Sequence, residues 1–119
     1  MVDAPASEHF TVMPGSDWIT NPELAYFRFH GRNAEGYLRG RTVADRFDHD
    51  YSELEVEEIA QRLANIAPEV QRIHAAANNN RSDYAPKFAE RLREILRKRD
   101  ELQQALRFKR KAASQGELL

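Results

Sequence analysis

Residues 25–33 read AYFRFHGRN, and this stretch decides the fold. Its first five residues, AYFRF, are rich in aromatic side chains and lie between Pro22 and Gly31, which predicts a short β-strand over residues 25–29. Side chains alternate across a strand, so Tyr26 and Arg28 are expected on one side and residues 25, 27 and 29 on the other. A polar cluster, His30-Gly31-Arg32-Asn33, follows at the carboxyl-terminal end of the strand.

A helix is predicted to begin at Ser52, because Ser52 and Glu55 have the spacing of a capping box. Apolar residues then recur at helical spacing, at Val56, Ile59, Leu63 and Ile66. Pro68 marks the end of this helix, and residues 34–51, which precede it, read as polar and irregular.

A second strand is predicted over residues 70–77, and it ends in three consecutive asparagines. A second helix is expected to begin near Ser82 or Asp83, with Pro86 in its first turn. The apolar stripe expected for this helix is formed by Phe88, Leu92, Ile95 or Leu96, Leu102 and Leu106.

Alternation of strand and helix predicts an α/β fold with parallel strands. The expected organisation is an irregular segment over residues 1–24, a strand-loop-helix unit occurring twice over residues 25–108, and a flexible tail over residues 109–119. Two parallel strands leave unpaired edges and are marginal in water. The pattern therefore predicts further strands from amino-terminal sequence, another chain or self-association, and the alternative is a compact helix pair with an irregular hairpin.

Composition restricts the classes of function. The chain has 119 residues, no cysteine and a net charge of −1, and no run is long and apolar enough for a membrane span. A cytoplasmic protein is expected, with neither a membrane nor nucleic acid as its partner. The basic stretch over residues 96–111 is read as a solvated helix face, with binding of RNA or an acidic partner as the alternative.

Three motifs resemble the YecE-like proteins, known as domain of unknown function 72. They are AYFRFHGRN, then RFDHDYSELEVEEIA over residues 46–60, and IHAAANNNRSDYAPKFAERLREIL over residues 73–96. The opening VDAP, residues 2–5, resembles the end of an earlier strand of that family. The resemblance covers roughly residues 2–96 in order. This chain departs from the family at residues 74–77, which are less apolar, and at His49 and Asp50.

The resemblance implies a partial TIM-barrel-like fold, namely the carboxyl-terminal portion of a barrel of about 250 residues. The family is described as related to sugar isomerases, without an established activity. It implies a truncated chain that carries part of a polar small-molecule site and is inactive alone. The expected ligand is small and polar or phosphorylated, and the sequence identifies no cofactor and does not decide whether the chain is an enzyme.

Catalytic roles are predicted for His30 as acid or base and for Asp48 as a base or as the group that orients His30. Arg32 is expected to bind a phosphate or carboxylate. The alternative is that Arg32 pairs with a loop carboxylate and that His30 is structural.

Further ligand-binding candidates are polar side chains beside this cluster: Asn33, Arg46, Tyr51, Asn78 and Asn79. Their alternative role is to organise turns and loops. A metal site from His30, Asp48, His49 and His74 is not favoured, because no tight ligand spacing is present. An interaction module that uses the exposed sheet edge and the basic carboxyl-terminal helix is the alternative function.

Overall fold

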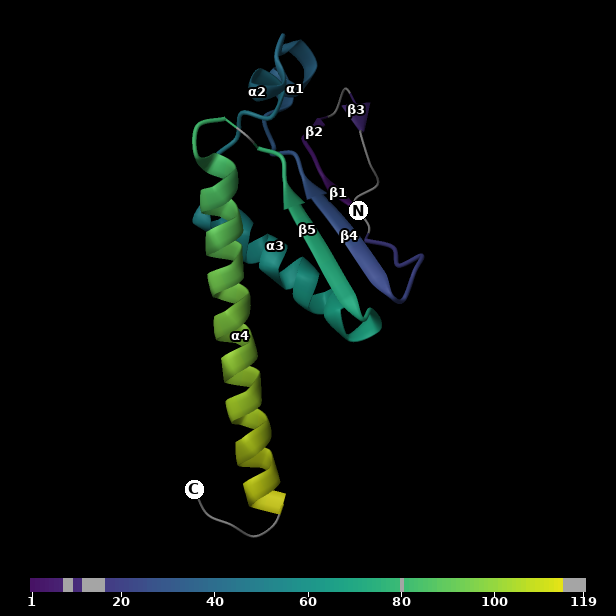
Figure 1. Cartoon of the computed structure of the whole chain (residues 1–119), viewed down its shortest axis with the longest axis vertical. Helices are drawn as coiled ribbons and strands as arrows, with labels where there is room; N and C mark the ends of the chain where they lie inside the picture. Colours follow the sequence, from purple (N-terminus) through teal and green to yellow (C-terminus); the bar gives the residue numbers. More distant parts are fainter. Residues whose placement is uncertain (8–9, 12–16, 80, 115–119) are drawn as a thin grey trace.

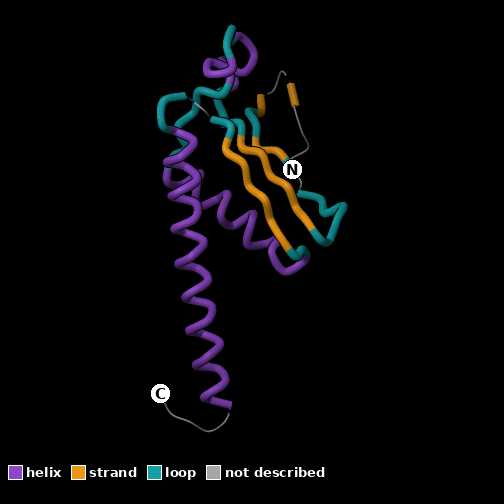
Figure 2. The backbone as a smooth tube through the Cα atoms, viewed as in Figure 1, coloured by secondary structure: helices purple, strands orange, loops and turns teal. Residues whose placement is uncertain are grey.

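The computed structural model describes residues 1–7, 10–11, 17–79 and 81–114. It shows a mixed α/β fold around a three-stranded parallel sheet in the order β1-β4-β5 (Figures 1 and 2). β1 spans Val2–Asp3, β4 spans Leu24–Phe29 and β5 spans Arg72–Ala77. A two-stranded antiparallel pair, β2 (Ala6–Ser7) and β3 (Phe10–Thr11), follows β1.

The central strand β4 confirms the predicted alternation, because its odd-numbered residues are buried and its even-numbered residues are exposed. Phe27 and Phe29 are fully buried, whereas Tyr26 is 46% exposed. β4 pairs in parallel with β5, where Tyr26 lies opposite His74 and Phe29 opposite Ala77. On its other edge Phe29 lies opposite Asp3 of β1.

Two residues of β1 provide the third parallel strand. Within the segment predicted to be irregular, the structure therefore places three short strands, of which β1 belongs to the main sheet. β1 is too short to show a sequence periodicity, but the resemblance of VDAP to the end of an earlier strand predicted it, and its pairing with β4 agrees with that prediction.

The loop predicted to be irregular contains two short helices, α1 (Ala34–Arg39) and α2 (Val43–Arg46). Asn33 caps α1 by accepting a hydrogen bond from the Gly36 N–H. Thr42 and Asp45 form a capping box at the start of α2. The prediction was wrong here because side-chain caps, and not an apolar stripe, stabilise these single-turn elements.

Helix α3 (Glu53–Ile66) buries the four apolar residues predicted for it, and a short 3₁₀ turn, Ala67–Glu69, carries Pro68. Ser52 caps it as predicted, but only half of the capping box forms. The Glu55 carboxylate binds His49 Nε2 at 2.6 Å instead of reaching back to the Ser52 backbone.

Helix α4 (Tyr84–Ser114) begins close to the predicted position and is helical through residues 109–114, which were assigned to a flexible tail. Phe88, Leu92 and Ile95 are buried against the sheet and α3. Leu102 and Leu106, which belong to the predicted stripe, are 62% and 44% exposed, so the buried part of the stripe ends before them. The helix continues past the end of the sheet, where no described element covers them (Figure 1).

Both long helices lie on the same face of the sheet. Phe29 of β4 contacts Phe88 of α4, and the side chains of α3 that are buried join the same core cluster. The opposite face, which carries Leu24, Tyr26, Arg28, Arg72 and His74, is exposed and is called the bare face below.

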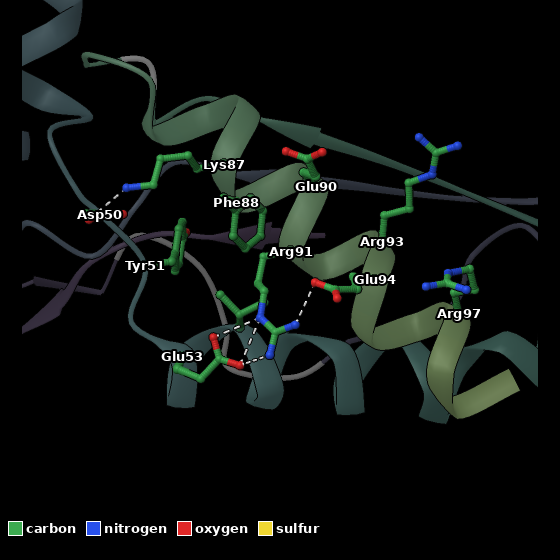
Figure 3. Close-up of a pocket in the computed structure, with 11 residues that line it drawn as sticks. Asp50, Tyr51, Glu53, Lys87, Phe88, Glu90, Arg91, Arg93, Glu94 and Arg97 are labelled. Carbon is green, nitrogen blue, oxygen red and sulfur yellow. Dashed lines mark hydrogen bonds and ion pairs between the residues drawn. The ribbon is translucent and has the colours of Figure 1, made fainter. Parts of the chain in front are cut away.

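A polar groove of about 790 Å³ lies between the start of α3 and α4 (Figure 3). Its charges largely neutralise one another: Arg91 binds Glu53 and Glu94, and Lys87 lies 3.8 Å from Asp50. The groove is therefore a set of exposed ion pairs that join two helices, and such pairs contribute little stability.

Candidate functional site

Polar residues gather where the three parallel strands end. Asp3 ends β1, His30 follows β4, and Asn78 and Asn79 follow β5. The backbone joins these ends, since His30 N–H donates to Asp3 O at 2.9 Å and Asn78 N–H donates to Phe29 O at 2.7 Å. The carboxyl-terminal edge of parallel strands is where α/β proteins place their ligands.

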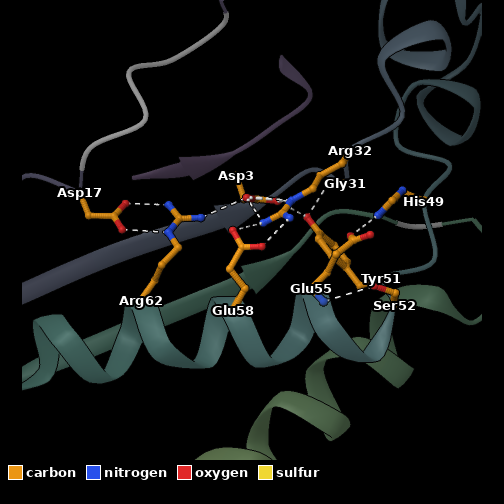
Figure 4. A network of polar contacts seen from close by, with 10 residues as sticks. All are labelled: Asp3, Asp17, Gly31, Arg32, His49, Tyr51, Ser52, Glu55, Glu58 and Arg62. Atoms are coloured by element: carbon orange, nitrogen blue, oxygen red, sulfur yellow. Dashed lines mark hydrogen bonds and ion pairs between the residues drawn. The ribbon is translucent and has the colours of Figure 1, made fainter. Parts of the chain in front are cut away.

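On the helix side of this edge, the buried carboxylate of Asp3 is the centre of a polar network (Figure 4). Arg32 donates to both Asp3 oxygens, with Nη2 3.0 Å from Oδ1 and Nε 3.1 Å from Oδ2. Arg62 Nη1 lies 3.0 Å from Asp3 Oδ1, and Arg62 Nη2 lies 2.7 Å from Asp17 Oδ1. Arg32 further binds Glu58 of α3.

Tyr51 completes the network from the loop before α3. Its hydroxyl donates to Asp3 Oδ2 at 2.7 Å and accepts from the Gly31 N–H at 2.9 Å. Burial, together with the Asp3 carboxylate, raises the pKa of Tyr51 above its ordinary value. The phenol therefore stays protonated and acts as a fixed hydrogen-bond donor.

Arg32 is equally fixed. Burial opposes its charge, but hydrogen bonds from the guanidinium to Asp3 and Glu58 outweigh burial and raise the pKa of Arg32 above its usual value. The Arg32 side chain forms ion pairs with a carboxylate of β1 and a carboxylate of α3. These contacts agree with the alternative role, in which Arg32 is an ion-pair partner and not a ligand-binding residue.

Asn33 and Arg46 lie around the two short helices. Besides capping α1, Asn33 donates from Nδ2 to the Asp48 backbone oxygen at 2.9 Å. Arg46 is exposed, and its Nε lies 3.4 Å from Gly40 O. Neither side chain is brought to the strand ends, and their ligand-binding roles stay predictions.

Asn79 is fully buried beside Gly31. Its Nδ2 donates to His49 O at 3.0 Å, and its Oδ1 has no hydrogen-bond partner among the described residues. Gly31 has φ of +90°, and a Cβ there would lie 2.6 Å from His49 Cβ. The strand end and the 48–51 loop therefore approach so closely that only glycine fits.

On the bare face, the edge carries His30 and Asn78 together with Arg28. Arg28 Nε donates to Asn78 Oδ1 at 3.2 Å. The His30 ring stacks on Phe47 with centroids 4.7 Å apart, and its buried Nδ1 has no hydrogen-bond partner in the described structure. Burial and the nearby Arg28 charge lower the pKa of His30, against an opposing effect of Asp3.

Among the described residues no hydrogen bond joins Asp48 to His30, whose buried Nδ1 has no partner. Its carboxylate lies 3.7 Å from Arg81 Nε. The catalytic assignment of Asp48 stays a prediction that the geometry of this structure does not support.

Sequence reasoning did not select Asp3 and Arg28. Asp3 follows the first residue of a two-residue strand, and its role appears only once β1 pairs with β4. Arg28 was placed correctly on the face of Tyr26, and the signal that could have found it is a cation within an otherwise aromatic strand, two residues before His30.

Two features bear on cofactors and membranes. Across the described ranges, no three or more His, Asp or Glu side chains cluster in a way that could hold a metal ion. No helix in the described part of the chain has both the length and the apolar character required to cross a bilayer.

Comparisons with known proteins place this α/β chain in a family. The family model described as protein of unknown function DUF72 matches residues 1–113. A search among curated proteins finds no match. The chain belongs to the DUF72 family, as its three motifs predicted.

Two solved structures of this family are similar to the chain. A DUF72 family protein of Enterococcus faecalis is 30% identical with a TM-score of 0.68, and the match covers 81% of this chain and 36% of that one. A DUF72 family protein of Thermotoga maritima is 27% identical with a TM-score of 0.72, over 81% of this chain and 35% of that one. The chain thus spans about a third of the length of these relatives.

Proposed function

We propose that this chain forms the carboxyl-terminal part of a TIM-barrel-like protein and carries part of a polar small-molecule site. The observation that carries the proposal is the division of the sheet into two faces. Both long helices pack on one face, and on the other face Arg28, His30 and Asn78 meet at the carboxyl-terminal edge.

One-sided packing favours a barrel. In a TIM barrel every crossover helix lies outside and the inner side of the strands faces other strands, whereas a doubly wound sheet carries helices on both faces. The bare face corresponds to the inner side of such a wall. The share of the two solved relatives that the chain spans, 36% and 35%, is consistent with a barrel portion.

The proposed site lies on the bare side of the strand ends. His30 is the acid or base, because its pKa is lowered and a neutral imidazole is able to accept a proton near pH 7. Asn78 supplies amide donors to a hydroxyl-bearing, sugar-like ligand. Arg32, Tyr51 and Asn79 hold the strand ends and the loop in place behind these groups.

A ligand-mapping experiment tests the site. The amide and imidazole NMR signals of the full chain are followed during titration with neutral monosaccharides, and shifts are expected at His30 and Asn78. Because only part of the site is present, affinity in about the millimolar range is expected. Isomerase activity on the same sugars should be undetectable.

Two histidines of the bare face provide a matched pair of variants. His30→Gln should weaken monosaccharide binding by about fivefold or more. His74→Gln, at the third residue of β5 and opposite Tyr26 of β4, should change it by less than about twofold. Equal effects of the two substitutions, or shifts confined to residues outside the strand ends, would count against the proposed site.

A second candidate function, protein interaction, is favoured by one observation on α4. The apolar stripe of this helix is buried at Leu92 and Ile95 but exposed at Leu102 and Leu106, beside the exposed cations Arg107 and Lys109. Sedimentation of the chain and of Leu102→Glu tests whether this segment mediates self-association. A monomeric wild-type chain would remove the support for self-association.

A further inference from the structure

Arg28 differs from the other arginines at the strand ends in its partners. Arg32 and Arg62, on the helix side, bind the carboxylates of Asp3, Asp17 and Glu58. Arg28, on the bare face, makes one side-chain hydrogen bond, to Asn78 Oδ1, and no carboxylate of the described chain pairs with it. Among the described residues, the charge of this guanidinium is therefore not paired with a carboxylate.

The position of Arg28 is rigid. Its strand is the central one, and its backbone N–H donates to Met1 O at 3.1 Å. Asn78, which receives the Arg28 Nε hydrogen bond, is itself held by the bond from its N–H to Phe29 O. A guanidinium fixed through Nε keeps both terminal nitrogens available for a forked interaction with an anion.

Two further groups complete the surroundings of Arg28. Asn78 uses its carbonyl oxygen for Arg28, which leaves its amide N–H groups as donors. His30 lies two residues beyond Arg28 on the same side of the strand, with its ring fixed against Phe47. The Arg28 charge contributes to lowering the pKa of His30, and a bound anion would offset that effect.

We propose that Arg28, Asn78 and His30 form a subsite for a phosphoryl group, so that the small polar ligand of this edge is phosphorylated. The inference rests on the proposed function and names its ligand class. A phosphoryl group offers three acceptor oxygens, which matches a guanidinium fork, an amide and an imidazole that approach from separate side chains. A carboxylate offers two acceptor oxygens in one plane, so it matches donors that approach from three separate side chains less well than a tetrahedral phosphoryl group does.

Arg72 provides the control for simple electrostatic attraction. It is exposed at the amino-terminal end of β5, opposite Leu24 on the central strand. Arg28 comes four positions after Leu24 along the strand, so the backbone positions of Arg72 and Arg28 are offset by on the order of 13 Å along the sheet. The substitution Arg72→Gln removes the same charge from the same face of the sheet and leaves the three residues of the subsite unchanged.

The experiment titrates the full chain with inorganic phosphate at constant ionic strength, in parallel with the neutral polyol sorbitol, and follows the NMR signals of Arg28, His30 and Asn78. Phosphate is expected to shift all three and to raise the pKa of His30. Arg28→Gln should weaken phosphate binding by about tenfold or more, Arg28→Lys by severalfold because the fork is lost, and Arg72→Gln by less than about twofold.

The outcomes separate this inference from the proposed function. If sorbitol shifts His30 and Asn78 but phosphate does not, the phosphoryl subsite is overturned and the polar site stands. If neither ligand shifts them, both are overturned. Equal weakening by Arg28→Gln and Arg72→Gln indicates diffuse attraction and overturns the subsite. If Arg28→Gln does not fold, Arg28→Lys decides, and binding equal to that of Arg72→Gln overturns the inference.

Discussion

The Tyr51 hydroxyl lies 2.7 Å from Asp3 Oδ2 and joins the end of the first strand to a loop 48 residues later. The same hydroxyl accepts the Gly31 N–H, so one phenol connects β1, the turn after β4 and the start of α3. These contacts position the carboxyl-terminal edge of the sheet, on whose other side the proposed site lies. Stability of this edge and geometry of the site are therefore linked.

Tyr51→Phe should destabilise the chain by about 2 kcal/mol, because the substitution leaves the buried Gly31 N–H without an acceptor and removes one donor from Asp3. Chemical denaturation measures the free energy of unfolding. Tyr26→Phe is the matched control, since Tyr26 lies half-exposed on the bare face, and a change within about 0.5 kcal/mol is expected. Similar losses in both variants would contradict the structural role of the Tyr51 hydroxyl.

Gly31→Ala should be among the most destabilising single substitutions at this edge. The positive φ disfavours any side chain, and the new Cβ would meet His49 Cβ at 2.6 Å, a contact with little freedom to relax. A loss of about 3 kcal/mol or more is expected from strain and displacement of the loop. Thermal unfolding followed by circular dichroism checks it, and a melting temperature equal to that of the wild type would disprove the close approach.

The main strand and the first long helix could be predicted from sequence because each shows a repeated pattern. β4 alternates over six residues and α3 repeats an apolar stripe over fourteen, and burial followed both patterns. β1 has two residues and α2 four, so neither is long enough for periodicity. The cap at α2, Thr42 with Asp45, was nevertheless a readable local signal.

The candidate site was only partly predictable. The sequence shows which residues follow a strand, but it does not show which partners their polar side chains bind. His30 and Asn78 were placed at the strand ends correctly. Arg32 was chosen as a ligand-binding residue, yet its partners are carboxylates 29 and 26 residues away in sequence. Pairing between residues so far apart has no local sequence pattern. For the same reason, the role of Asp3 at the centre of the polar network could not be predicted.

Two leucines of α4 should differ sharply in their contribution to stability. Leu92 is 5% exposed in the core, and Leu92→Ala should cost about 3 kcal/mol through lost burial and a cavity. Leu106 is 44% exposed beyond the sheet, and Leu106→Ala should cost less than about 0.5 kcal/mol. Denaturation of both variants at low protein concentration checks this. A large loss for Leu106→Ala would indicate that another surface covers the end of the helix.

Acidification should destabilise the chain through His30. Burial and the Arg28 charge lower the pKa of His30 in the folded state, although Asp3 opposes them, so the unfolded chain binds a proton more readily than the folded one. The contribution of His30 to the free energy of unfolding therefore falls as the pH drops from about 7.5 through the unfolded pKa near 6.5.

His30→Gln removes this titration and should flatten the decline between about pH 7.5 and pH 5.5, measured by urea denaturation at each pH. The carboxylates whose pKa values are lowered, Asp45, Glu53 and Glu94, lose their contributions only below about pH 4.5, outside this window. Every other side chain is common to both proteins, so the difference between the two profiles reports on residue 30 alone. Parallel profiles for the wild type and His30→Gln would show that Arg28 and burial do not disfavour the imidazolium. The proposed site would then lack the neutral base that it requires.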